Sequence, residues 1–281
     1  MKIGIVGLGL IGGSLGFDLR AAGHEVLGVS RQTATCEQAI ALGAVDRASA
    51  EFELLSAAEA IFLCTPLGVM PQTAEALVPY LSPAAILTDV GSVKASVVET
   101  LEPLWHRFVG GHPMAGKETA GIAAAQAGLF ANRPYVLTPT ARTDSEAKAT
   151  LEHLIRALQS NYYECSPAQH DRAVAWISHL PVMASASLIA ACQQEPEATT
   201  LALAQALASS GFRDTSRVGG GNPALGRMMA QYNREELLRS LQIYRQSIDR
   251  CILLIEQHRW DDLERHLTET HQARPQFADK A

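Results

Sequence analysis

Hydrophobic positions follow a strand-like and a helical pattern along the chain. The two patterns alternate in the first part, and only the helical one continues in the second. In the first part, short apolar runs alternate with amphipathic stretches of helical period. The apolar runs predict strands at residues 3–6, 25–29, 60–64, 85–90, 108–110 and 135–138. The stretches between them predict helices at residues 11–22, 36–42, 71–80, 94–101 and 144–158. This alternation predicts an α/β fold with a Rossmann-type, doubly wound and mostly parallel sheet over residues 1–165.

Strand patterns stop after about Ser166, and the rest of the chain is rich in Ala, Leu, Ile and Gln. Helices are predicted at residues 167–194, 198–208 and 234–259, which gives an all-α C-terminal domain over residues 166–281. In the last of these helices Ile243, Ile248, Ile252 and Ile255 recur at roughly helical spacing. A small domain of long apolar helices has few internal partners, so we expect it to form a homodimer. A self-contained helical bundle is the alternative.

Composition and charge narrow the class of protein. The chain has 281 residues, of which 47% are hydrophobic and 19% charged, as is typical of globular proteins. A net charge of −6 provides no basic surface field, so nucleic acid is not an expected partner. We also expect no membrane contact, because no apolar run reaches membrane-spanning length and no secretory leader precedes the first strand. The five cysteines lie far apart without a C-x-x-C pair, so we expect a cytoplasmic protein with no disulfide frame and no metal site.

The first strand runs directly into a glycine-rich turn. The turn has the spacing Gly7-x-Gly9-x-x-Gly12 and is followed by a helix and a second strand. This order predicts a dinucleotide site, with the phosphates held at the helix N-terminus. The residues expected to contact the cofactor there are Gly7, Gly9, Leu10, Ile11 and Gly12. A tight turn that binds nothing is the alternative.

The end of the second strand predicts which nucleotide binds. NAD-binding folds place an acidic residue there to hold the ribose hydroxyls. This chain has Ser30, Arg31, Gln32 and Thr33 instead. Two hydroxyls and a planar cation suit a 2′-phosphate, so the predicted cofactor is NADP. If Arg31 is only a solvated surface residue, cofactor preference stays open.

Further candidate residues follow the next strands. Cys64, Thr65 and Pro66 close the strand at 60–64 and are expected to line the cofactor site, with Cys64 a core residue rather than a nucleophile. Ser92 could cap the helix that follows it, or could point its hydroxyl at substrate or nicotinamide.

Lys94 follows the strand that ends at Asp89, and two roles are open for it. It could be a solvated lysine in the first turn of a helix, or its ammonium group could hold the Asp89 carboxylate.

A single histidine, His112, stands between a diglycine and Pro113 in a loop expected to face the cleft. Flanking Gly and Pro fix the backbone rather than fill a core. Imidazole titrates near neutral pH, so His112 is a candidate general base that takes a hydroxyl proton as hydride leaves the same carbon. A structural or exposed histidine is the alternative.

Two candidates lie in the helical part. His179 precedes Pro181, which cannot donate to the helix ladder and should kink the helix, aiming His179 at the cleft. Otherwise His179 bonds a neighbouring carbonyl. Arg217 could clamp a substrate carboxylate through two hydrogen bonds, whereas Arg213 and Asp214 could pair for structure alone.

The glycine turn, DVGSVK, GGHPMAG, SHLP and GFRDTSRVGGGNP together resemble the prephenate/arogenate dehydrogenase family of tyrosine biosynthesis, in order and over nearly the whole chain. The resemblance implies an oxidoreductase that oxidises and decarboxylates a cyclohexadienol. Hydride passes from the ring carbinol to the nicotinamide, and the ring carboxylate leaves as carbon dioxide while the ring becomes aromatic.

The resemblance also implies residue roles. His112 accepts the ring hydroxyl proton, and Ser92 orients that hydroxyl or His112. Arg217 binds the substrate, at a carboxylate, and His179 lies near the side chain or the nicotinamide. The chain departs from many relatives after the Asn-Pro pair, where Leu225-Gly226-Arg227 replaces a tryptophan.

NADP use without a fused mutase or regulatory domain resembles the arogenate-specific branch, which forms L-tyrosine from L-arogenate. The alternative is a prephenate dehydrogenase, which forms 4-hydroxyphenylpyruvate. A β-hydroxyacid dehydrogenase-like enzyme would need a catalytic lysine on the helix at 167–194, and that segment contains no lysine. A non-catalytic NADP sensor would not need His112, His179 and Arg217 together.

Overall fold

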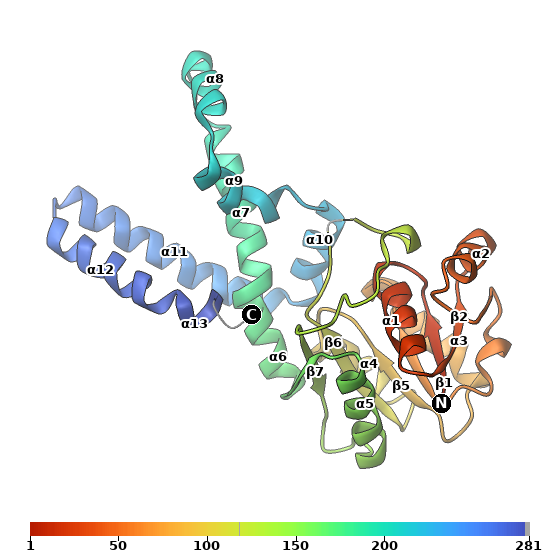
Figure 1. Ribbon diagram of the computed structural model, residues 1–281. Coiled ribbons are helices and arrows are strands. Elements are labelled where there is room, and N and C mark those ends of the chain that lie inside the picture. Colours follow the sequence, from red (N-terminus) through yellow and green to blue (C-terminus); the bar gives the residue numbers. More distant parts are fainter. Residues whose placement is uncertain (118, 279–281) are drawn as a thin grey trace. The chain divides into compact units, whose positions relative to one another are not determined.

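The computed structural model describes residues 1–117 and 119–278, and the chain forms two compact units (Figure 1). The first unit contains residues 1–173 and 221–232, and the second contains residues 174–220 and 233–281. Each unit is described separately below.

The first unit is built on an eight-stranded sheet with the order β3-β2-β1-β4-β5-β6-β7-β8. The strands are β1 (Lys2–Val6), β2 (Glu25–Val29), β3 (Arg47–Ser49), β4 (Ala60–Leu63), β5 (Ile86–Asp89), β6 (Phe108–Pro113), β7 (Pro134–Thr138) and β8 (Asn161–Glu164). All neighbouring strands are parallel except β6 and β7, which are antiparallel. The predicted mostly parallel, doubly wound sheet is therefore confirmed.

Helices cover both faces of this sheet, and each face has its own apolar core (Figure 1). On one face lie α1 (Leu10–Ala21), α2 (Thr33–Ala41) and α5 (Ser145–Ala157). On the other lie α3 (Met70–Leu77) and α4 (Ala95–Leu101). The central strands β1, β4 and β5 are buried on both sides, so their sequences are mostly apolar without alternation, and β5 ends in the buried polar residues Thr88 and Asp89. The sheet order places β1 between β2 and β4, which makes the carboxyl ends of these strands the topological switch point.

The second unit is all helical in the part that the structure describes, as predicted. Its helices are α7 (Leu180–Cys192), α8 (Ala198–Leu207), α9 (Ser210–Ser216), α11 (Arg234–Glu256), α12 (Trp260–Ala273) and α13 (Pro275–Ala278). The helix α6 (Pro167–Val174) leads into it, and α10 (Pro223–Tyr232) belongs to the first unit.

The predicted helix at 167–194 is interrupted by a π-helical turn, Ala175–His179, between α6 and α7. Pro181 lies in the first turn of α7 and has no N–H to donate to the carbonyl of Ile177. The helical hydrogen bonds therefore change to the wider π pattern just before the proline, and His179 is the last residue of the π turn. Such turns in helices are frequent at functional sites.

The combined helix Pro167–Cys192 is long and apolar enough, by length and composition, to cross a membrane. This corrects the prediction that no segment reaches that length. Only 28% of its most apolar window is buried within the chain. Near its N-terminal end lies Asp171, whose carboxylate accepts hydrogen bonds from the start of α4, so this end belongs to the first unit.

Candidate active site

The three glycines of the turn after β1 differ in why each position has no side chain. Gly7 has a φ of +102°, and a Cβ there would lie 2.7 Å from the carbonyl oxygen of Cys64. A Cβ on Gly12 would collide with the carbonyl oxygen of Gly7. A Cβ on Gly9 would meet nothing within 4 Å. Packing therefore requires Gly7 and Gly12, whereas Gly9 leaves an open face, as close approach of a pyrophosphate would need.

The helix α1 begins directly after Gly9, so Leu10 and Ile11 lie in its first turn. Gly9 provides no side-chain cap, and no acidic residue lies in that turn. The amide groups of a helix N-terminus without such partners form an anion site when a phosphate approaches. The turn fits the phosphates of a dinucleotide.

The segment after β2 lies beside this turn, because Val6 of β1 pairs with Val29 of β2. Ser30 is half-buried, and Arg31, Gln32 and Thr33 are exposed. Arg31 forms no ion pair with any carboxylate in residues 1–117 or 119–278. Its guanidinium group is therefore available to an external anion.

The segment after β4 lies on the other side of the glycine turn, because Leu63 pairs with Val6. Burial, with Asp89 nearby, raises the pKa of the Cys64 thiol far above its usual range, which keeps it protonated and unreactive at neutral pH. The hydroxyl oxygen of Thr65 is buried and has no hydrogen-bond partner among the described residues. Pro66 is exposed. The predicted cofactor residues therefore meet at the carboxyl ends of β1, β2 and β4.

A buried ion pair lies at the carboxyl ends of β5 and β6. The ammonium group of Lys94 donates to the Asp89 carboxylate and, at 2.7 Å, to the carbonyl oxygen of Gly111. Asp89 also accepts from the backbone N–H of Gly91 at 2.7 Å and of Gly111 at 3.1 Å. Burial lowers the pKa of Lys94, and the attraction of Asp89 opposes this. Of the two roles open for Lys94, the structure shows that it holds Asp89, and the pair fixes the strand next to His112.

Ser92 does not cap α4. The backbone N–H of Lys94 donates to Asp171 Oδ1 at 2.7 Å, and that of Ala95 donates to Asp171 Oδ2 at 2.8 Å. Asp171 of α6 therefore supplies the cap that Ser92 could have supplied. The half-buried Ser92 hydroxyl is left for its other predicted role, toward substrate or nicotinamide.

His112 lies within β6 rather than in a loop, because β6 continues to Pro113 and His112 pairs with Val136 of β7. It is 9% exposed. Its Nδ1 atom lies 2.8 Å from Nε2 of His170, and Nδ1 of His170 lies 2.8 Å from Asp171 Oδ1. His170 and Asp171 were not among the predicted site residues. Their only sequence signal is an adjacent histidine and aspartate at the start of a long helix.

His179 and Arg217 lie in the second unit. His179 is fully buried at the end of the π turn, and its Nδ1 lies 3.1 Å from the side-chain nitrogen of Asn233, a partner that the sequence did not indicate. Arg217 is exposed and begins the 3-10 turn Arg217–Gly220. That turn packs on α7, because the N–H of Gly219 donates to the Ser185 hydroxyl at 2.8 Å. The structure therefore carries His112 and Ser92 on one unit, and His179 and Arg217 on the other.

Arg213 and Asp214 form an exposed ion pair at 3.4 Å, consistent with the purely structural alternative. The segment Leu225–Arg227, where many relatives are expected to carry a tryptophan, lies within α10.

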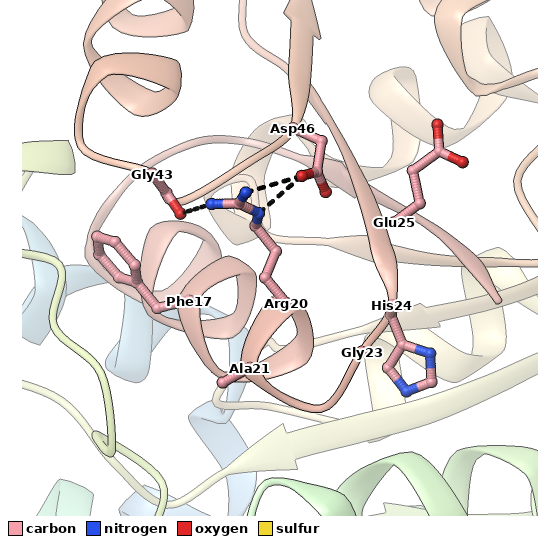
Figure 2. A pocket seen from close by; sticks show the side chains of 8 residues that line it. All are labelled: Phe17, Arg20, Ala21, Gly23, His24, Glu25, Gly43 and Asp46. Atoms are coloured by element: carbon pink, nitrogen blue, oxygen red, sulfur yellow. Dashed lines mark hydrogen bonds and ion pairs between the residues drawn. The ribbon is translucent and has the colours of Figure 1, made fainter.

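A shallow depression lies at the other end of the sheet, between the end of α1 and the start of β2 (Figure 2). The Arg20 side chain lies in it (Figure 2), where Nε donates to Asp46 at 2.9 Å and Nη1 donates to the carbonyl oxygen of Gly43. Burial raises the pKa of Asp46, but hydrogen bonds from the N–H of Val26 and from Arg20 outweigh it and lower the pKa overall. The cation is already paired, so this depression serves structure. Within residues 1–117 and 119–278, no cluster of three or more His, Cys, Asp or Glu side chains could hold a metal ion.

Comparison with known proteins agrees with this architecture. The family model described as "Prephenate dehydrogenase, nucleotide-binding domain" matches residues 15–164, and "Prephenate dehydrogenase, dimerization domain" matches residues 166–269. The cyclohexadienyl dehydrogenase of Zymomonas mobilis is 31% identical, over 97% of this chain and 94% of its own.

Two solved structures align over nearly the full length. The arogenate dehydrogenase of Synechocystis is 55% identical with a TM-score of 0.92, covering 99% of this chain and 100% of its own. The prephenate dehydrogenase of Aquifex aeolicus, in complex with hydroxyphenyl propionate and NAD+, is 26% identical with a TM-score of 0.92, covering 98% of each chain. With both family models matched and these relatives aligned end to end, the chain belongs to the prephenate dehydrogenase family of oxidoreductases.

Proposed function

We propose that this protein is an NADP-dependent arogenate dehydrogenase, which converts L-arogenate to L-tyrosine and carbon dioxide by oxidative decarboxylation. The observation that carries the proposal is the 55% identity, over 99% of the chain, with the arogenate dehydrogenase of Synechocystis. The relatives named prephenate dehydrogenase are less similar, at 32% identity for the Bacillus subtilis protein and 26% for that of Aquifex aeolicus.

In the proposed reaction His112 accepts one proton from the substrate and later returns it. When bound, the nicotinamide supplies the hydride acceptor for the ring carbinol. His112 takes the hydroxyl proton as the carbinol carbon is oxidised to a conjugated ketone. The carbon–carbon bond to the ring carboxylate then breaks, and its electron pair moves through the ring to the ketone oxygen. That oxygen recovers the proton from His112 and becomes the phenol of tyrosine.

The other candidate residues bind and orient. Ser92, beside the cap of α4, would hold the ring hydroxyl or the His112 imidazole in place. Arg217 would bind a substrate carboxylate through two parallel hydrogen bonds, for which its planar guanidinium group is suited. His179 would contact the substrate side chain or the nicotinamide. Positioning matters most here, because aromatisation makes the loss of carbon dioxide favourable by itself.

NADP is supported by the residues after β2. A carboxylate there would repel a 2′-phosphate, and this chain has Ser30, Arg31, Gln32 and Thr33 instead. Arg31 is exposed and holds no carboxylate in the described part of the chain, so its charge remains available to phosphate. The glycine turn and the segment at Cys64, Thr65 and Pro66 would contact the rest of the cofactor.

We also propose a cytoplasmic homodimer formed through the predicted helical domain, residues 166–281. The matching family model bears the name of a dimerization domain. The helices α8 and α11 carry apolar side chains that are exposed in the single chain, namely Leu203, Leu207, Ile243, Ile248, Ile252 and Ile255. A second copy of the chain would remove them from water.

A steady-state assay tests the function. The purified protein is mixed with arogenate or prephenate, each with NADP or NAD, and the reduced cofactor is followed by its absorbance. We expect the highest kcat/KM for arogenate with NADP. A higher kcat/KM for prephenate would favour the prephenate dehydrogenase alternative. Tight NADP binding without turnover of either substrate would favour a non-catalytic sensor.

A further inference from the structure

We propose that His170 is a positioning residue that, held by Asp171, fixes the tautomer of His112 so that its Nε2 atom carries the basic lone pair. The inference rests on the proposed function in one respect, which is that His112 acts as the base. The tautomer itself follows from three hydrogen bonds within the first unit.

The chain of hydrogen bonds is anchored at Asp171. Its Oδ1 accepts from the backbone N–H of Lys94 at 2.7 Å, and its Oδ2 accepts from that of Ala95 at 2.8 Å. A backbone N–H can only donate, so both carboxylate oxygens act as acceptors. Asp171 is 3% exposed, which leaves little water to compete for these sites.

The acceptor character of Asp171 determines the protonation of His170. Nδ1 of His170 lies 2.8 Å from Asp171 Oδ1, and an oxygen that already accepts there favours a second N–H donor. Nδ1 of His170 therefore carries the hydrogen. In a neutral imidazole the other nitrogen, Nε2, is then an acceptor.

The acceptor at His170 Nε2 in turn determines the tautomer of His112. The two atoms His170 Nε2 and His112 Nδ1 lie 2.8 Å apart, and one of them must donate. Because His170 accepts, His112 donates from Nδ1, and its lone pair lies on Nε2. The opposite tautomer would set two lone pairs against each other in a site where His170 is 2% exposed.

The same lysine supports the chain of bonds from the backbone side. The N–H of Lys94 holds Asp171, while its side chain holds the carbonyl oxygen of Gly111, the residue before His112. Lys94 thus helps to fix both the backbone next to His112 and, through Asp171 and His170, the His112 ring. When His112 becomes an imidazolium ion, the oriented His170 and the Asp171 carboxylate stabilise the positive charge, as a carboxylate does behind a catalytic histidine.

Two substitutions at position 170 separate this role from simple packing. In His170→Gln the amide oxygen can reach the position of Nε2 and accept from His112. In His170→Asn the shorter amide can donate to Asp171 but does not reach His112. We expect kcat to fall about 10–100-fold in His170→Asn, by analogy with the loss of a hydrogen-bond partner that orients a metal-binding histidine. We expect His170→Gln to recover most of kcat, with the Kd for NADP and the Tm similar in the two variants.

The direct readout is the ¹⁵N spectrum of the His112 ring in the NADP-bound protein, assigned by comparison with His112→Asn. The expected wild-type spectrum shows Nδ1 protonated and Nε2 unprotonated, with a mixture of tautomers in His170→Asn. A wild-type His112 protonated on Nε2, or equal kcat in the Gln and Asn variants, would overturn the proposal. This readout needs no turnover, so an enzyme inactive on arogenate and prephenate would refute the proposed function and leave the tautomer to be decided by the spectrum.

Discussion

The two units hold their candidate residues in opposite ways. In the first unit His112 belongs to a series of buried polar groups, each held by at least one other: Asp89, Lys94, His170 and Asp171. In the second unit Arg217 is exposed on a short turn, whereas His179 is buried beside Asn233. Rigid placement suits a group that moves a proton, and an accessible cation suits a group that meets substrate from solvent.

The apolar residues show the same contrast. Both faces of the first unit's sheet have a buried apolar core. In the second unit the buried hydrophobic residues are few, chiefly Leu180, Leu237 and Leu254, while Leu207 is 70% exposed and Ile255 50% exposed. The apolar side chains of the first unit are therefore covered largely by its own core, whereas those of the second unit leave more apolar surface exposed in the single chain.

The largest expected effect concerns the rigidly held base of the first unit. His112→Asn should lower kcat about 10²–10⁴-fold, the range for a lost general base. The Kd for NADP should stay within a few-fold, because His112 lies on β6 and not in the glycine turn. Steady-state kinetics and fluorescence titration of the cofactor measure the two quantities. Unchanged kcat would remove His112 from the mechanism and with it the functional contrast between the units.

The sequence was sufficient for most of the first unit because its central strands are continuous apolar runs. It missed β3, with the sequence Arg-Ala-Ser, and β8, with Asn-Tyr-Tyr-Glu. These strands form the two edges of the sheet, where little side-chain surface is buried and no hydrophobic pattern is required. The helix α12 was missed for a related reason, since none of its residues is buried in the single chain.

The candidate site was predicted in part for the same physical reason. Glycines and strand ends leave local signals, so the cofactor turn and His112 could be picked out individually. The partner of His112 could not, because His170 is 58 residues away in sequence and meets it only when α6 packs beside β6. The π turn before His179 depends on one missing donor at Pro181, which predicts a kink but not its form.

The next largest effect concerns the exposed cation of the second unit. Arg217→Ala should weaken substrate binding by about 2–5 kcal/mol, the cost of removing one partner from a charge pair that becomes buried on binding. We expect KM to rise with a smaller change in kcat. Arg213→Ala is a matched control, because Arg213 is also exposed and already pairs with Asp214. An unchanged KM in Arg217→Ala would refute the carboxylate clamp.

A smaller effect tests whether the apolar surface of the second unit needs a second copy. Ile252 on α11 is 47% exposed and Ile40 on α2 is 45% exposed, so the same substitution can be made at matched sites in the two units. Because Ile252 is already about half buried in the single chain, Ile252→Asp should weaken a dimer by about 1.5–3 kcal/mol over its two copies, each contributing about half the value of burying a fully exposed side chain. Ile40→Asp should leave the dimer intact. Sedimentation over a concentration series measures both, and equal dissociation constants would contradict a dimer through this face.

The smallest expected effect returns to the first unit and concerns its one exposed candidate cation. If Arg31 binds the 2′-phosphate of NADP, Arg31→Ala removes a charged hydrogen bond and should raise the Kd for NADP roughly tenfold, about 1.5 kcal/mol. The Kd for NAD should not change, since NAD has no phosphate there. Arg47→Ala is the control, because Arg47 begins β3 and pairs with Leu27 in the middle of β2, before the carboxyl end where Ser30 lies, and because this substitution removes the same net charge. Raising the salt concentration should shrink the NADP effect, because an exposed ion pair is screened. Equal changes for NADP and NAD would mean that Arg31 acts on the shared part of the cofactor, and no change for either would leave it a solvated surface residue.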